Sequence, residues 1–198
     1  MTTSKRIVVF DFDGVIFDSM HAAYSTWQEG GATINLAQYK ERFHGNINDA
    51  AKPADMDFYA EYRKKVPQLI VFPGMAEVIA TLAAAHTLVI NSSTPSDIIE
   101  EILEDQNLSK YFAAVLGNDV SHSKTEKLRM VFDRYDTSAE NCVFITDTLG
   151  DLDDANEAKV QTIAVTWGFH DRAALGQGSP TKIANNPKEL PELVASLL

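Results

Sequence analysis

Residues 7–15 read IVVFDFDGV, and this stretch decides how the rest of the chain is interpreted. Ile7 to Phe12 is short, β-branched and aromatic, which is typical of a buried strand. Asp11 and Asp13 are two positions apart, so in an extended segment their side chains point the same way. Two carboxylates at a buried strand end repel each other and lose hydration. The stretch therefore predicts a buried strand that ends at a cation site.

Four further apolar runs resemble this first strand and alternate with helical patterns. The runs are Thr87–Asn91, Phe112–Leu116, Cys142–Thr146 and Thr162–Val165. Between them apolar residues recur at helical spacing, and one such helix has Thr94 as its expected N-cap with Pro95 at its first position. Alternating strands and helices predict an α/β fold, a Rossmann-like parallel sheet with helices on both faces.

The stretch from Ser19 to Val71 interrupts this alternation. It has no convincing strand, and it contains three aromatic-rich helical segments: His21–Trp27, Ala37–Phe43 and Asp57–Lys65. We interpret it as a small helical cap inserted after strand one, over the carboxyl edge of the sheet. The predicted domains are a core of residues 1–18 and 72–198 and a cap of residues 19–71.

Length and charge narrow the function further. The chain has 198 residues, of which 45% are hydrophobic, enough for one domain with a sizeable core. Lys and Arg number 17 against 28 Asp and Glu, so the formal charge is −11. This acidic balance is unfavourable for binding nucleic acid or an anionic membrane surface. An anionic ligand would need local positive charge, from a metal ion or a placed lysine.

Cysteine usage and hydropathy bear on location. A single cysteine, Cys142, excludes an internal disulfide framework and fits a reducing compartment. The opening residues MTTSKR lack the apolar segment of a signal peptide, and no apolar run approaches the ~20 residues that span a bilayer. We expect a cytoplasmic protein. The sequence leaves the oligomeric state open.

Polar residues follow each of the first four predicted strands. Ser92 and Ser93 follow the second, Lys124 comes after the third, and Asp147 and Asp151 follow the fourth. In open α/β sheets the ligand lies outside the carboxyl ends of the strands. Together with the acidic pair after strand one, these groups could hold a hard dication through oxygen ligands, with a phosphoryl group between metal and lysine. Lys127 competes with Lys124 for that role.

These motifs, in this order, resemble the haloacid dehalogenase (HAD) superfamily of phosphohydrolases, in the branch with a cap after the first strand, similar to phosphoglycolate phosphatases. The resemblance rests on DxDGV at 11–15, a serine closing the second strand, a lysine after the third, and DTLGD at 147–151. IVFPGMAEVIATL at 70–82 and TWGFH at 166–170 are also similar to the family. The resemblance covers nearly all of the core and says little about the substrate.

The resemblance implies a Mg²⁺-dependent phosphatase that hydrolyses a small phosphorylated metabolite. Asp11 would be the nucleophile that forms an aspartyl phosphate. Asp13 would be the general acid that protonates the leaving group and then activates water. Dehalogenase members lack an acid at the position of Asp13, so its presence favours phosphoryl transfer.

The resemblance also implies the ligand-binding residues. Mg²⁺ would be held by Asp11, by the backbone carbonyl of Asp13 and by Asp147, with water completing the oxygen shell. Asp151 would orient a water molecule or Lys124. By the same resemblance, Ser92 and the backbone N–H of Ser93 would bind phosphate oxygens, and Lys124 would neutralise charge on Asp11 and the phosphoryl group.

The sequence departs from the family pattern in three places. Thr125 follows the lysine where proline is usual, and Thr146 precedes Asp147 where glycine is usual. The cap is also short, which bears on substrate size. Related caps carry a specificity loop in the region of RFHGN at 42–46, so possible specificity residues are Arg42, His44 and Asn46. Trp167 to His170 are candidates for the mouth of the cleft.

Several alternatives remain open at this point. A phosphomutase of the same superfamily would use the same two aspartates, but it needs a cap that holds a large sugar phosphate. Phosphonate cleavage needs a cap lysine, for which the candidates are Lys40, Lys52, Lys64 and Lys65. A receiver domain would carry its acceptor aspartate after the third strand and no cap. A catalytically silent phosphate-binding protein would not need all of the expected catalytic groups.

Overall fold

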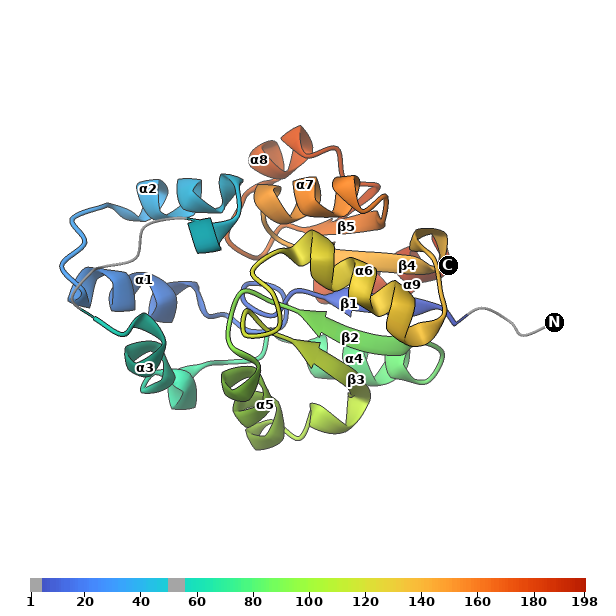
Figure 1. The fold of residues 1–198 in the computed structure, drawn as a ribbon, viewed down its shortest axis with the longest axis horizontal. Helices are drawn as coiled ribbons and strands as arrows, with labels where there is room; N and C mark the ends of the chain where they lie inside the picture. Colours follow the sequence, from blue (N-terminus) through green and yellow to red (C-terminus); the bar gives the residue numbers. More distant parts are fainter. Residues whose placement is uncertain (1–4, 50–55) are drawn as a thin grey trace.

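A parallel β-sheet forms the centre of the computed structural model, which describes residues 5–49 and 56–198 (Figure 1). Within these residues the sheet has six strands in the order β3-β2-β1-β4-β5-β6. The strands are β1 (Ile7–Phe10), β2 (Thr87–Asn91), β3 (Phe112–Leu116), β4 (Cys142–Thr146), β5 (Gln161–Val165) and β6 (Lys182–Ala184). The first strand lies between β2 and β4, so its carboxyl end is at the middle of the sheet. This order places the loop after β1 beside the loops after β2 and β4.

Helices cover both faces of this sheet, as predicted. The core helices are α4 (Met75–Ala83), α5 (Ser96–Asp105), α6 (Lys124–Tyr135), α7 (Leu149–Glu157), α8 (Arg172–Gln177) and α9 (Leu190–Ala195). Alternate side chains of β1 point to opposite faces. Val8 and Phe10 therefore pack with α4, α5 and α9, whereas Ile7 and Val9 pack with α6 and α7. Short 3-10 helices lie at Ser109–Tyr111, Ala139–Asn141 and Pro187–Glu189.

The cap is helical in the part that the structure describes. It comprises α1 (Met20–Glu29), α2 (Leu36–Glu41) and α3 (Phe58–Arg63), with 3-10 helices at Arg42–His44, Ile47–Asp49 and Val66–Gln68. Figure 1 shows these helices beyond the carboxyl ends of the strands. The chain enters and leaves the cap side by side, because Phe17 bridges Val71 and the N–H of Asp18 donates to the carbonyl of Ile70 at 2.9 Å. The predicted boundary between core and cap falls where these two segments lie side by side. It stays a prediction.

Three local predictions need correction. The first strand ends at Phe10 rather than Phe12, because residues 11 and 12 already belong to the loop that turns at residues 14–16. A sixth strand, β6, was not predicted, since its three residues carry too little of an alternating pattern. The N-cap of α5 is Pro95 rather than Thr94. The Thr94 hydroxyl instead donates to Asp13, and the N–H of Ser96 is capped by Asp119 from the loop after β3.

No helix in residues 5–49 and 56–198 is long and apolar enough to cross a membrane.

Candidate active site

The loop after β1 positions two carboxylates at the centre of the sheet edge. The N–H of Asp11 donates to Ile145 of β4 at 2.9 Å, and the side chain of Asp11 accepts from the N–H of Phe12 at 2.7 Å. The loop then turns at Gly14, whose φ of +75° is a left-handed conformation that glycine adopts without strain. A Cβ at Gly14 would also overlap the carboxylate of Asp147. Glycine is therefore required here for two independent reasons.

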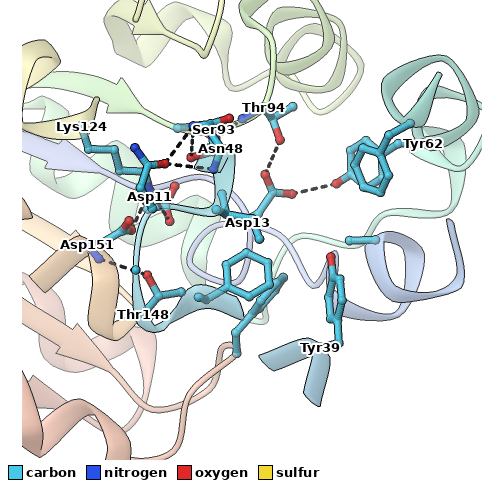
Figure 2. A pocket seen from close by; sticks show the side chains of 18 of the residues that line it. Asp11, Asp13, Tyr39, Asn48, Tyr62, Ser93, Thr94, Lys124, Thr148 and Asp151 are labelled. Carbon is cyan, nitrogen blue, oxygen red and sulfur yellow. Dashed lines mark hydrogen bonds and ion pairs between the residues drawn. The ribbon is translucent and has the colours of Figure 1, made fainter. Parts of the chain in front are cut away.

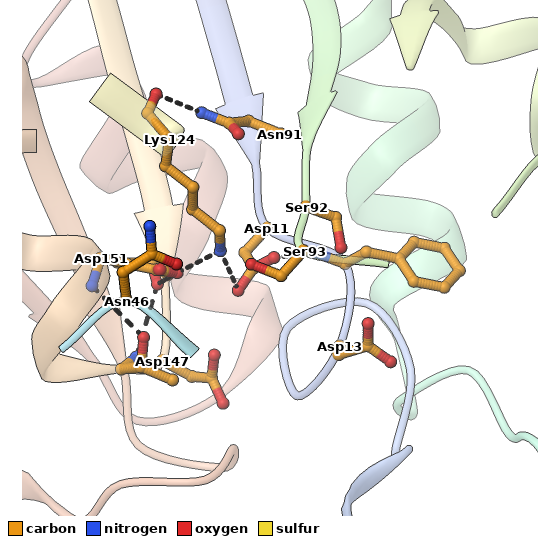
Figure 3. Close-up of polar contacts among 12 residues, drawn as sticks. Asp11, Asp13, Asn46, Asn91, Ser92, Ser93, Lys124, Asp147 and Asp151 are labelled. Atoms are coloured by element: carbon orange, nitrogen blue, oxygen red, sulfur yellow. Dashed lines mark hydrogen bonds and ion pairs between the residues drawn. The ribbon is translucent and has the colours of Figure 1, made fainter. Parts of the chain in front are cut away.

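Lys124, the first residue of α6, brings the acidic groups together. Its Nζ lies 2.9 Å from Oδ2 of Asp11 and 2.6 Å from Oδ2 of Asp151 (Figure 3). All three side chains are buried, so water screens these ion pairs poorly. Asn91 at the end of β2 donates to the carbonyl of Lys124 at 3.0 Å and fixes the start of the helix. The residue predicted to neutralise Asp11 thus contacts Asp11 directly.

Lys127 does different work from its neighbour. Its Nζ donates to the carbonyl of Ser92 at 2.5 Å and to that of Gly117 at 3.3 Å, so it joins α6 to the loops after β2 and β3. Burial, followed by the charge of Lys124, lowers the pKa of Lys127 to about 7. Of the two candidate lysines, only Lys124 forms an ion pair with Asp11 among the described residues.

The buried carboxylates exceed the positive charge that balances them. Burial raises the pKa of Asp11 well above its usual value, although Lys124 opposes the shift. Burial likewise raises the pKa of Asp147 to about 7. Asp151 is an exception, because the pull of Lys124 outweighs burial and lowers its pKa. Three buried carboxylates around one ammonium group leave excess negative charge, which is the condition for binding a cation.

Asp147 is the carboxylate that best fits a metal ligand. It follows β4, and its Oδ2 accepts from the N–H of Phe169 at 2.6 Å. A Cβ at Gly14 or Gly168 would overlap its side chain, so two glycine backbones enclose it. Its other oxygen, Oδ1, is buried without a hydrogen-bond partner. A buried orphan oxygen of this kind is costly unless a cation takes it.

The donor set fits a hard dication. Mg²⁺ prefers few carboxylates together with carbonyl oxygens and water. The predicted ligands are two carboxylates, from Asp11 and Asp147, and the backbone carbonyl of Asp13. Accordingly, no three His, Cys, Asp or Glu side chains gather as a metal cluster in the described part of the chain.

Thr146 and Thr125, two of the three departures from the family pattern, support the acidic loop. Thr146 donates its hydroxyl to Oδ2 of Asp151 at 2.6 Å. Thr125 donates to the side chain of Asp154 at 2.9 Å and so joins α6 to α7. Sequence reasoning did not assign either contact, because a hydroxyl in a strand or helix carries no signal of its partner.

The loop after β2 forms the opposite wall. Ser92 is fully buried and its Oγ accepts from the N–H of Thr94 at 3.1 Å. The carbonyl of Ser93 accepts from the hydroxyl of Tyr59 in the cap at 2.7 Å. Both serines line one cavity with Asp11, Asp13 and Lys124. The structure therefore brings the predicted phosphate-binding residues together.

This cavity, about 80 Å³ in volume, lies between core and cap (Figure 2). It has room for several water molecules and thus for a small anion. Its cap wall is largely aromatic and amide. The wall includes Trp27, Tyr39, Phe43, Asn46, Asn48, Phe58, Tyr59 and Tyr62.

Of the predicted specificity residues, only Asn46 lines the cavity. It donates to the carbonyl of His122 at 3.0 Å. The guanidinium of Arg42 stacks on Trp27, 4.1 Å from the ring centre, and the exposed ring of His44 lies 4.9 Å from that of His170. Periodicity cannot distinguish these outcomes, because the short 3-10 turn at Arg42–His44 rotates neighbouring side chains apart.

Three cap residues that sequence reasoning missed lie at the site. Tyr62 donates to Oδ1 of Asp13 at 2.7 Å, and Tyr59 reaches the Ser93 carbonyl. Asn48 donates to the Ser93 hydroxyl at 3.4 Å. The only available signal was the spacing of Tyr59 and Tyr62, which places both on one face of a helix.

The segment after β5 contributes one residue to the cavity wall, Phe169. Trp167 donates its indole N–H to the carbonyl of Val15 at 3.2 Å. Nδ1 of His170 accepts from the N–H of Leu149 at 3.0 Å, so its Nε2 carries the proton toward the carbonyl of Lys40. This segment thus joins α2 of the cap to the start of α7.

No lysine of the described cap lines the cavity. Lys64 pairs with Glu61, and Lys65 pairs with Glu29. Lys40 is likewise absent from the cavity wall, whereas Lys52 lies outside the described residues. The described residues thus give phosphonate cleavage no Schiff-base lysine.

The chain is similar to known proteins along nearly its whole length. A phosphoglycolate phosphatase of Synechococcus elongatus is 25% identical over 98% of this chain and 99% of its own length. One of Vibrio parahaemolyticus is 27% identical over 96% of each. A haloacid dehalogenase-like hydrolase from Streptococcus pneumoniae has a similar fold, with a TM-score of 0.81 at 21% identity over 97% of this chain and 99% of its own. The family model described as haloacid dehalogenase-like hydrolase matches residues 8–165, which confirms the resemblance, and the chain belongs to that family.

Proposed function

We propose that this hydrolase is a Mg²⁺-dependent phosphatase that cleaves a small phosphorylated metabolite through an aspartyl-phosphate intermediate. The observation that carries the proposal is the ion pair of Lys124 with Asp11, in a cavity that also contains Asp13, Ser92 and Ser93. Relatives named phosphoglycolate phosphatase along nearly the whole chain support this class of substrate.

Asp11 is the proposed nucleophile. Its Oδ1 is held by the N–H of Phe12 and its Oδ2 by Lys124, so the carboxylate has one orientation. In the first step an oxygen of Asp11 bonds to phosphorus as the bond from phosphorus to the leaving oxygen breaks. Lys124 favours the ionised form of Asp11 and balances charge on the phosphoryl oxygens.

Asp13 is the proposed general acid and base. It gives a proton to the leaving oxygen, which departs as an alcohol. Water then attacks phosphorus, Asp13 takes the proton of that water, and the bond from phosphorus to Asp11 breaks. Inorganic phosphate leaves and both carboxylates return to their starting state.

Asp11, the carbonyl of Asp13 and Asp147 are the proposed Mg²⁺ ligands. When bound, Mg²⁺ supplies positive charge against the phosphoryl oxygens. The orphan Oδ1 of Asp147 supports this assignment, as does the shortage of positive charge around the buried carboxylates. Asp151 is proposed to hold Lys124 in place through its own ion pair with the ammonium group.

The cavity favours hydrolysis of a small substrate over phosphoryl return to a sugar. A cavity of about 80 Å³ with a largely aromatic cap wall supports a small substrate, whereas a mutase must hold a large sugar phosphate in two orientations. The single buried cysteine, Cys142, fits a reducing compartment, and we propose the cytoplasm as the location.

Hydrolysis of 4-nitrophenyl phosphate tests the proposal. We expect turnover with Mg²⁺ that EDTA abolishes and that Asp11→Asn lowers by at least about 10³-fold, because an amide cannot displace the leaving group. Asp153→Asn, an exposed carboxylate on α7, is the matched control and should retain activity. After a short incubation with labelled substrate, acid quenching should retain phosphate on the wild type but not on Asp11→Asn. Turnover that survives EDTA or Asp11→Asn would refute the proposal.

A further inference from the structure

Both oxygens of Asp13 are held by hydroxyl groups from different parts of the molecule. Thr94 of the core donates to Oδ2 at 2.7 Å, and Tyr62 of the cap donates to Oδ1 at 2.7 Å (Figure 2). A carboxylate has about four acceptor positions, so each oxygen keeps one for a substrate or water. The two bonds fix the carboxylate plane while Asp13 still lines the cavity.

Tyr62 is built to remain a donor. Its side chain is only 2% exposed, and the rings of Tyr62 and Phe58 stack 6.0 Å apart. Burial, followed by the charge of Asp13, raises the pKa of the Tyr62 phenol well above its usual value. The phenol therefore stays protonated throughout the neutral range.

Tyr59, one helical turn earlier on α3, makes a different contact. Its hydroxyl donates to the carbonyl of Ser93 and accepts from Asn118 at 2.8 Å. Through this contact Tyr59 docks the cap on the loop after β2. Variants of Tyr59 and Tyr62 can therefore be compared to separate the effect of cap docking from the effect on proton transfer.

We infer that Tyr62 is a positioning residue for the acid–base step, so that a cap residue sets the orientation from which Asp13 transfers its proton. The inference rests on the proposed phosphatase function. Once the Tyr62 hydroxyl is lost, Oδ1 of Asp13 loses that donor while Thr94 still holds Oδ2, and the carboxyl can rotate about the bond that joins it to Cβ. Proton delivery to the leaving oxygen then becomes slower, whereas attack by Asp11 is unaffected.

The test uses phenyl phosphates of similar size whose leaving groups differ in basicity. A 4-nitrophenolate leaves without a proton, whereas a 4-methylphenolate needs one. For Tyr62→Phe we expect kcat/KM to fall within about 2-fold on 4-nitrophenyl phosphate and by about 10-fold or more on 4-methylphenyl phosphate. The phenylalanine ring preserves packing, and circular dichroism checks the fold.

Two control variants separate positioning from docking and folding. Tyr59→Phe should lower kcat/KM by a similar factor on all substrates, because it removes the hydroxyl that bonds the Ser93 carbonyl and leaves the Tyr62 bond to Asp13 in place. Tyr24→Phe removes a phenol that bonds two cap residues, the carbonyl of Ile34 and the side chain of Gln28. It should leave kcat/KM unchanged on both substrates. In an Asp13→Ala background, adding Tyr62→Phe should not change how kcat/KM depends on the leaving group.

The outcomes distinguish the two proposals. If the wild type hydrolyses the series and Tyr62→Phe lowers all substrates equally, Tyr62 is only structural and the inference is wrong. A leaving-group dependence that persists in the Asp13→Ala background also overturns it. A wild type that hydrolyses none of the substrates with Mg²⁺ overturns the proposed function, and the inference falls with it.

Discussion

Individual residues at this site work because burial changes their chemistry. Asp147 is fully buried, and its carboxylate oxygens have unequal surroundings, one bonded to Phe169 and one orphaned. Removing a charged carboxylate from water favours its protonated form. A buried carboxylate that favours cation binding therefore destabilises the folded state when the cation is absent.

The pH dependence of stability follows from Asp147. Its pKa in the folded chain is about 7 against 3.8 without the fold, so between these values the folded state holds the extra proton. In Mg²⁺-free buffer we expect the free energy of unfolding to fall, by on the order of a few kcal/mol, as pH rises from about 4 to about 7. Asp11 shifts in the same direction. Urea unfolding across this pH range is the measurement.

Added Mg²⁺ and the uncharged variant Asp147→Asn are the controls. Saturating Mg²⁺ at pH 7 should restore about 2–3 kcal/mol, since it binds the folded state alone. Asp147→Asn should make the pH dependence shallower, leaving the part due to Asp11, and abolish the Mg²⁺ effect, whereas Asp153→Asn should leave both unchanged. An equal response to Mg²⁺ in Asp147→Asn would exclude Asp147 as a ligand.

At the scale of elements, α3 is the helix that docks the cap on the core. Tyr59 and Tyr62 face the cavity, and Arg63 reaches across to α5, where Nη2 lies 2.5 Å from Asp97 and Nε lies 3.1 Å from Glu101. These ion pairs are partly exposed, so each contributes about 1 kcal/mol or less. Their effect is therefore on cap docking rather than on whether the chain folds.

Arg63→Gln should raise KM about 2- to 5-fold at low salt. The reason is that weaker docking of the cap on the core keeps the cavity open for longer. The effect should vanish at about 1 M salt, where surface ion pairs are screened in the wild type as well. Lys64→Gln is the matched control, because Lys64 pairs with Glu61 of the same helix. Initial rates at several salt concentrations measure this. An equal change in both variants would point to net charge instead of docking.

The whole molecule shares one main hydrophobic cluster between cap and core. Trp27, Tyr39 and Tyr62 of the cap belong to the same buried cluster as Phe12 and Val15 of the core. A cap that buries its aromatic face on the core loses that burial when it separates. Cap and core are therefore expected to unfold together, since neither face is stable in water alone.

The two tryptophans test this cooperativity. Trp27 reports on the cap and Trp167 on the core, and the chain has no other tryptophan. In Trp167→Phe and Trp27→Phe, the fluorescence transitions in urea should share the midpoint of circular dichroism at 222 nm. An earlier transition at Trp27 would mean that the cap unfolds by itself.

The sequence by itself determined the parallel α/β core, because strand and helix periodicities are local and repeat along the chain. It also determined which residues gather at the carboxyl edge, since parallel strands bring their ends to one side. Asp11, Ser92 and Lys124 were therefore predictable as neighbours. Their catalytic and ligand roles stay predictions.

Only the tertiary structure decided which hydroxyl meets which carboxylate. Thr94 has the pattern of a helix cap, yet it bonds Asp13, 81 positions away. Tyr62 has the pattern of an apolar helix face, yet it bonds the other oxygen of Asp13. Local patterns carry no information on such partners, because a hydrogen bond between distant segments depends on how the cap packs on the core. Which residues lie at the carboxyl edge of the sheet thus follows from the sequence, whereas the orientation of Asp13 follows from how the cap packs on the core.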